Sequence, residues 1–266
     1  MIRSRPGGVR AVLFDLDETL IHHRRSDAEA FAAVAAAAGI GKEALPAAVG
    51  EAAMALWRSG PAFPYCQRIG ISWSEGLAGP FGPSPEADLQ VLHDWIPTYR
   101  ERAWGAALAA LGRPEARLAR RAAEAFRDAR LAHIMCYDDA ASTLEILSGR
   151  FRLALVTNGA PDFQALKLER SGLRRFFDAV LISGAVGYGK PDPRIFQMAR
   201  EQLGGVEPAE VLMVGDNPTR DVAGAHAAGI FAVLVDRSEP PESGRSVAVG
   251  PDATVGSLAE LGAWLG

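Results

Sequence analysis

Several side chains that could do chemistry follow short apolar segments of this chain. Four segments read as buried strands, and the polar stretches after them are Asp15-Leu-Asp17-Glu-Thr19, Thr157-Asn158-Gly159, Ser183 to Lys190, and Gly215-Asp216-Asn-Pro-Thr-Arg-Asp221. In an open parallel sheet, ligands bind beyond the carboxyl ends of the strands. We therefore expect acids, a lysine and a hydroxyl to converge on one crevice.

Each of these features alone has an ordinary structural explanation. An Asp after a strand is often a helix cap or a turn former, and Thr157-Asn158-Gly159 by itself is a turn sequence. Lys190 is more informative, because only Lys42, Lys167 and Lys190 are lysines among the 28 Lys and Arg residues. A compact ammonium group suits a phosphate or a neighbouring carboxylate. The functional interpretation depends on four complementary strand ends occurring together.

The elements that would position these residues alternate between helix and strand. The expected strands are Val9–Phe14, Arg152–Val156, Ala179–Ile182, Val211–Val214 and Ile230–Val235. The expected helices between and after them are Ala140–Leu147, Asp162–Arg170, Pro193–Leu203, Asp221–Ala228 and one capped by Ser257-x-x-Glu260. Short apolar strands alternating with helices are typical of a parallel sheet covered on both faces. The predicted fold class is α/β, with a doubly wound, Rossmann-like parallel sheet.

The region between the first strand and residue 135 has no convincing strand. Ser26-x-x-Glu29 has the form of a capping box that would begin a helix. Further helical patterns cover Ala44–Trp57, Glu86–Leu111 and Pro114–His133, with a Gly/Pro/aromatic loop at Gly60–Pro85. Within that loop, the segment Tyr65–Gly82 either closes over a substrate or packs Trp73 and Phe81 between helices. We expect residues 1–20 and 136–266 to form the α/β core and residues 21–135 a helical cap domain.

Composition limits the class of protein. The chain has 266 residues, 48% of them hydrophobic, which fits a core domain carrying a smaller one. Its net charge is −4, so it lacks the basic field of a nucleic-acid binder. The basic leader Met1–Arg10 precedes an apolar run cut by Asp15 and Asp17, so neither a signal peptide nor a membrane span is expected. Cys66 and Cys136 have no metal-ligand spacing and read as free thiols of a reducing compartment. We expect a cytoplasmic protein, and the sequence leaves its oligomeric state open.

Together, the four motifs resemble those of the haloacid dehalogenase (HAD) superfamily. The motifs are Asp15-x-Asp17-x-Thr19, Thr157-Asn158, Lys190 and Gly215-Asp216-x-x-x-x-Asp221, in the family's order. They span the core, roughly Val9–Thr19 and Cys136–Val235. The insert between them resembles the helical cap that many members carry after the first motif.

The resemblance implies a chemical role for the two acids of the first motif. Asp15 would be the nucleophile that forms an aspartyl-phosphate. Asp17 would protonate the leaving oxygen and then act as the base for the water that releases phosphate. This route replaces one very slow hydrolysis by two easier steps.

The resemblance also implies a Mg2+ cofactor and a phosphate site. The carboxylates of Asp15 and Asp216 and the backbone carbonyl of Asp17 would bind the ion, and oxygen ligands suit it. Asp221 would either support this metal site or bind the ion directly. The phosphoryl oxygens would be held by Thr157, Asn158 and Lys190, with Lys190 also neutralising the nucleophile. Thr19 would brace the loop.

The predicted function is therefore Mg2+-dependent hydrolysis of a small phosphorylated metabolite. Dehalogenases of the superfamily need neither the acid at Asp17 nor the metal ligand at Asp216, so both residues count against that alternative. Phosphonate hydrolases use a cap lysine, and the expected cap offers only Lys42. A phosphomutase is compatible with every residue, and a non-catalytic phosphate-binding protein is disfavoured by the intact motifs. Neither nucleic acid nor membrane is an expected partner.

Two other signals are weaker. Gly184-x-x-x-x-Gly189-Lys190 nearly matches a P-loop, but Pro191 stands where a Ser or Thr should bind magnesium. The five histidines show no metal-ligand spacing. Of these, His22 and His23 lie where the chain leaves the core, and a hinge role is favoured over substrate contact.

Overall fold

The central element of the computed structural model, which describes residues 7–237 and 250–265, is a six-stranded parallel sheet. Its order is β3-β2-β1-β4-β5-β6. The strands are β1 (Ala11–Phe14), β2 (Arg152–Thr157), β3 (Ala179–Ile182), β4 (Val211–Gly215), β5 (Phe231–Val235) and β6 (Ala253–Val255). The predicted doubly wound α/β fold is confirmed. The sequence did not predict β6, because it is only three residues long and its central Thr254 is exposed. The start of the basic leader, Met1–Pro6, lies outside the described residues.

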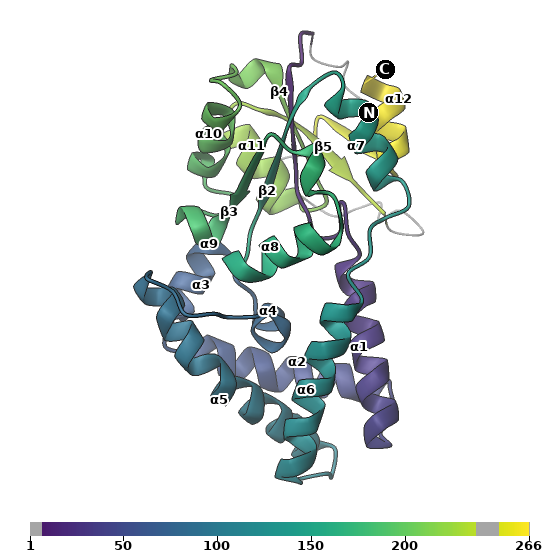
Figure 1. Cartoon of the computed structure of the whole chain (residues 1–266), viewed down its shortest axis with the longest axis vertical. Helices are drawn as coiled ribbons and strands as arrows, with labels where there is room; N and C mark the ends of the chain where they lie inside the picture. The colour runs from purple at the N-terminus through teal and green to yellow at the C-terminus, as the bar shows by residue number, and fades with distance from the viewer. Residues whose placement is uncertain (1–6, 238–249, 266) are drawn as a thin grey trace. The chain divides into compact units, whose positions relative to one another are not determined.

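Helices cover both faces of the sheet, as the apolar strands require. All four residues of β1 are buried, and they alternate between the two faces: Val12 and Phe14 pack in one core cluster, Ala11 and Leu13 in the other. The first cluster includes α7 (Ala140–Ser148) and α12 (Leu258–Leu265); the second includes α10 (Pro193–Gln202) and α11 (Ala223–Ala227). Figure 1 shows these two pairs of helices on opposite sides of the strands. The predicted cap at Ser257 is present, since its Oγ accepts a hydrogen bond from the Glu260 backbone N–H.

The chain divides into two compact units. The first contains Met1–His22, Met135–Asn158 and Gln164–Gly266, and the second contains His23–Ile134 with Gly159–Phe163. We propose that these units are the core and cap domains, with residues 159–163 added to the cap.

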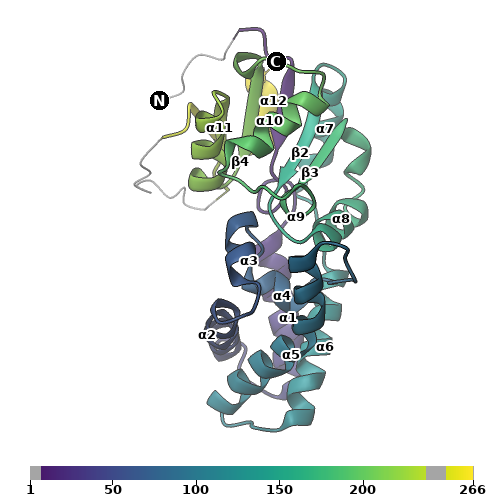
Figure 2. The ribbon, with the colours of Figure 1, turned by 90° about the vertical axis from the view of Figure 1, so that its left-hand side faces the viewer.

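The regular secondary structure that the structure describes in the second unit is helical. Its helices are α1 (His23–Ala38), α2 (Ala44–Arg58), α3 (Phe63–Ile69), α4 (Trp73–Ala78), α5 (Ala87–Ala110) and α6 (Ala116–Ala132). The helix α1 packs against α6 (Figure 2), and α5 contacts both α2 and α6. Aromatic rings fill the interior: the Trp57 and Tyr99 centroids lie 5.1 Å apart, and those of Phe31 and Phe126 lie 4.7 Å apart. Such contacts stabilise the unit beyond the area they bury.

Two sequence predictions about this unit are wrong. Ser26 does not cap a helix, because α1 already begins at His23 and the buried Ser26 hydroxyl donates to the backbone carbonyl of His133. The expected loop Gly60–Pro85 contains α3 and α4. The capping box lies instead at Ser72 and Glu75, where each side chain accepts the other residue's backbone N–H.

The aromatic residues of that segment contribute to packing. Trp73 and Phe81 are partly buried against the core of the second unit, and the Tyr99 hydroxyl donates to the Trp73 carbonyl. Of the two roles considered for Tyr65–Gly82, these contacts favour packing between helices.

Two predictions from composition can be compared with the structure. Cys66 and Cys136 are both free thiols, as expected. Within residues 7–237 and 250–265, none of the helices combines the length and the hydropathy needed to span a bilayer.

Candidate active site

Three neighbouring strands bring the predicted motifs to one edge of the sheet. The central strand β1 pairs with β2 on one side and with β4 on the other, and Phe14 is in register with Leu155 and Val214. The Asp15 backbone N–H donates to the Val214 carbonyl, 2.9 Å away. Asp15 therefore lies beside the C-terminal end of β4. Thr157 ends β2. Parallel pairing therefore places the first, second and fourth motifs side by side.

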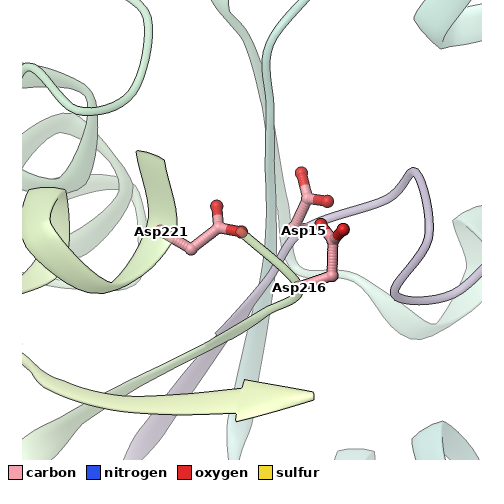
Figure 3. Close-up of side chains that lie close together, drawn as sticks. All are labelled: Asp15, Asp216 and Asp221. Atoms are coloured by element: carbon pink, nitrogen blue, oxygen red, sulfur yellow. The ribbon is translucent and has the colours of Figure 1, made fainter. Parts of the chain in front are cut away.

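Three carboxylates meet at this edge. Asp15, Asp216 and Asp221 each offer an oxygen, and the three oxygens lie within 4.8 Å of one another. Figure 3 shows these carboxylates gathered around one space, with Asp221 reaching in from the helical side. Hard oxygen donors in this number suit a divalent cation such as Mg2+.

The electrostatics of the cluster agree with a cation site. Burial raises the pKa of Asp216 to about 8, with further contributions from Asp15 and Asp221. Burial also raises the pKa of Asp15 to about 6, although the Lys190 ammonium opposes this shift. Crowded carboxylates that are poorly solvated need added positive charge in order to stay ionised. The residues present therefore fit a divalent cation.

Lys190 supplies part of that charge. Its Nζ lies 2.5 Å from Asp15 Oδ1 and 2.7 Å from Asp221 Oδ1, and the side chain is buried. Burial by itself would lower the pKa of Lys190, but Asp15 and Asp221 outweigh burial and raise it. The lysine predicted to neutralise Asp15 is thus placed directly against it.

Asp221 is held by the turn that follows β4. Asp221 Oδ2 accepts a hydrogen bond of 2.9 Å from the Asn217 backbone N–H. The segment Pro218–Val222 forms one turn of π-helix before α11, where the sequence predicted a helix beginning only at Asp221. Such turns occur often at functional sites. In this structure the π-turn carries Asp221 back toward the end of its own strand.

Gly215 leaves the room that Asp221 needs. A Cβ atom at Gly215 would lie 2.2 Å from Asp221 Oδ2. Gly215→Ala should therefore displace Asp221 and destabilise the fold by about 1–3 kcal/mol, the usual cost of overpacking. Gly105→Ala is the matched control, since an added Cβ there meets nothing within 4 Å inside α5. Chemical denaturation measures both, and equal stabilities of the two variants would contradict the prediction.

Asn158, Thr157 and Thr19 form hydrogen bonds with residues in or next to the carboxylate cluster. The Asn158 amide donates to the Lys190 carbonyl at 2.8 Å and accepts from the Lys190 backbone N–H at 2.7 Å. It therefore positions Lys190, and its predicted role as a phosphate ligand stays a prediction. The Thr157 hydroxyl donates to Gln164 Oε1 at 3.4 Å. The Thr19 hydroxyl donates to Asp15 Oδ2 at 3.4 Å, in keeping with a bracing role.

Asp17 follows Asp15 in the loop after β1, but its side chain contacts other partners. Lys167 Nζ lies 2.9 Å from Asp17 Oδ1 and 2.8 Å from Oδ2. Gln164 Nε2 donates to Oδ2 at 3.3 Å. Both partners come from α8 (Pro161–Arg170). Sequence reasoning did not select them, although the scarcity of lysine and the i, i+3 spacing after the second motif were available signals.

The pKa shifts predict how pH and Mg2+ affect stability. Asp15 and Asp216 bind protons more tightly in the folded chain than in the unfolded chain, so without metal the free energy of unfolding should fall as pH rises from about 4 to about 8. A bound cation should offset this loss. We expect Mg2+ to raise the melting temperature more at pH 8 than at pH 5, by differential scanning fluorimetry. An equal effect at both pH values would contradict the prediction.

Comparison with known proteins finds a matching family model and a relative that is similar over nearly the whole chain. Residues 9–229 match the family model for haloacid dehalogenase-like hydrolases. The chain is 40% identical over 253 residues to phosphoserine phosphatase of Thermus thermophilus, covering 95% of this chain and 98% of the relative.

Two solved structures have the same fold. The magnesium-bound HAD hydrolase YfnB of Bacillus subtilis superposes with a TM-score of 0.66 at 22% identity, covering 95% of this chain and 96% of the other. The 2-haloacid dehalogenase of Pseudomonas syringae superposes with a TM-score of 0.60 at 26% identity, covering 97% and 98%.

Proposed function

Because the chain belongs to the haloacid dehalogenase-like hydrolases, as its motifs indicated, we propose that it is a Mg2+-dependent phosphatase acting on a small phosphorylated metabolite. The observation that carries the proposal is the buried contact of Lys190 with Asp15 and Asp221, beside Asp216. A phosphate monoester brings negative charge to a carboxylate nucleophile, so the reaction requires concentrated positive charge at that place.

In the first step of the proposed reaction, Asp15 attacks phosphorus. A bond forms between a carboxylate oxygen of Asp15 and the phosphorus atom as the bond to the leaving oxygen breaks. Asp17 gives a proton to that oxygen. Lys190, 2.5 Å from Asp15 Oδ1, stays against the nucleophile and stabilises the charge on the transferring group.

The second step releases inorganic phosphate. Water attacks the phosphorus of the aspartyl-phosphate, Asp17 accepts a proton from the water, and the carboxylate of Asp15 leaves. Thr157, Asn158 and Lys190 are the proposed contacts for the phosphoryl oxygens. The Thr157 hydroxyl, which donates to Gln164 in the structure, would turn to a phosphoryl oxygen when substrate binds.

Asp15, Asp216 and the backbone carbonyl of Asp17 are the proposed Mg2+ ligands, with Asp221 close enough to join them. When bound, the ion would supply Lewis-acid stabilisation of the phosphoryl oxygens and keep the carboxylates ionised.

Phosphoserine is the first substrate to test. The supporting observation is the 40% identity to a phosphoserine phosphatase, which covers nearly the whole of both chains. The proposal for the substrate stands apart from the proposal for the reaction, because related chains act on different phosphate esters.

A phosphate-release screen tests the proposal. Phosphoserine, sugar phosphates, phosphoglycolate and nucleoside monophosphates are each incubated with the enzyme, with Mg2+ and with a chelator. We expect release of inorganic phosphate that requires Mg2+ and is fastest with phosphoserine. Phosphate transfer between metabolites without release would favour a phosphomutase, and halide release from a 2-haloacid would favour a dehalogenase.

A further inference from the structure

A buried lysine from the core contacts the residue proposed as acid and base. The Lys167 side chain is 0% exposed, and its Nζ is almost equally distant from both Asp17 oxygens, at 2.9 and 2.8 Å. The Asp17 side chain is 26% exposed, so a fully buried donor holds a side chain that is itself only partly buried. Charge-assisted hydrogen bonds of this kind are the strong ones.

Gln164 adds a second donor on the same carboxylate. Gln164 and Lys167 are three residues apart on α8, so they lie on one face of the helix. The Gln164 Nε2 group donates to Asp17 Oδ2, and its Oε1 accepts from Thr157. These contacts join the proposed acid and base to the second motif through one helix.

An ordinary structural role must be weighed against a functional one. A lysine that pairs with a carboxylate could simply anchor α8 to the loop after β1. However, burying an ammonium group is costly, and a side chain without charge would avoid that cost if anchoring α8 were the only role. Lys167 and Gln164 both donate to the Asp17 carboxylate, and this carboxylate is the proposed proton acceptor.

We propose that Lys167, assisted by Gln164, is a positioning residue that holds Asp17 as a hydrogen-bond acceptor for hydrolysis of the aspartyl-phosphate. The proposal rests on the function proposed above. In this step water oxygen bonds to phosphorus, the bond from phosphorus to Asp15 breaks, and the proton of the water passes to Asp17. Two donors limit the rotation of the Asp17 carboxylate and so keep it oriented for this proton transfer, and loss of such positioning can cost about 100-fold in rate.

The two half-reactions can be separated by kinetics with an aryl phosphate such as p-nitrophenyl phosphate. Its leaving group needs little protonation, so kcat/KM reports the attack of Asp15 with little dependence on Asp17. Hydrolysis of the aspartyl-phosphate then contributes to kcat. For Lys167→Met we expect kcat to fall by about tenfold or more, kcat/KM to change by less than about threefold, and phosphoenzyme to accumulate in acid-quenched samples.

Further variants distinguish positioning from folding. Lys167→Arg should recover part of kcat, since a guanidinium can donate to both oxygens. Gln164→Met should shift kcat in the same direction by a smaller factor, and it carries the test if Lys167→Met does not fold. Lys167→Met should add little in an Asp17→Asn background, because the residue it positions is already lost. Lys42→Met, an exposed lysine change, is the control and should leave both constants unchanged.

The outcomes are separable. Equal losses in kcat and kcat/KM, or no accumulation of phosphoenzyme, would overturn the positioning role of Lys167. Wild-type enzyme that releases no phosphate from any ester would instead overturn the proposed function.

Discussion

Replacing Asp15 by Asn should reduce phosphate release by on the order of 10^4-fold or more, the scale seen when an enzyme loses its nucleophile. The amide is a poor nucleophile and cannot form the aspartyl-phosphate. It also removes one charge from the cluster with Asp216 and Asp221. Steady-state phosphate release from the best substrate of the screen measures the effect.

The control for this prediction is a matched substitution elsewhere. Asp128 is exposed on α6, so Asp128→Asn should keep full activity. Circular dichroism should show that Asp15→Asn is folded. Turnover by folded Asp15→Asn at a rate near that of the wild type would exclude Asp15 as the nucleophile.

Asp17→Asn should lower kcat by about 10^2- to 10^4-fold, the usual contribution of a general acid or base. The amide can neither protonate the leaving oxygen nor accept a proton from water. For kcat/KM, the loss should be larger with alkyl phosphates than with aryl phosphates, because alkoxide leaving groups need the proton more. A series of esters with different leaving groups measures this dependence.

Metal binding provides a separate check on Asp17. Its proposed metal contact is the backbone carbonyl, so Mg2+ should still raise the melting temperature of Asp17→Asn, whereas Asp216→Asn should lose most of that effect. A kcat/KM loss that is the same for all leaving groups would contradict an acid role for Asp17.

The sheet and the carboxylate cluster could be predicted from sequence because their signals are local. Each strand is a short apolar run that ends in polar residues, and parallel pairing of such strands leaves little choice about where Asp15 and Asp216 meet. The lysine at the third motif was recognisable because it is rare and follows a strand. The signal for each of these features lies in residues close together in sequence, even though the cluster joins distant ones.

What could not be predicted depends on contacts between distant residues. Ser26 has the local pattern of a cap, but its hydroxyl is satisfied by His133, more than 100 residues away, and the helix begins earlier. The segment Phe63–Ala78 contains the two short helices α3 and α4, although it includes glycine and proline. Trp57 and Tyr99 pack against α4, where a Cβ at Gly76 would lie 2.4 Å from the Trp57 ring. Tertiary packing overrides local preference in such segments.

The contacts of Asp17 also could not be predicted, because they join residues that are distant in sequence. Nothing in the first motif indicates that Lys167 and Gln164 will face it, since they lie about 150 residues away in sequence. Only the crossing of α8 beside the end of β1 brings them together.

The central claim is that a phosphoryl group passes through Asp15. Wild-type enzyme mixed with substrate and Mg2+ can be quenched in acid within one turnover, digested and mapped by mass spectrometry. We predict one phosphoryl group on the peptide that carries Asp15, formed and lost at rates that match turnover. Phosphate release with no such adduct, or with the adduct on a different residue, would contradict the account.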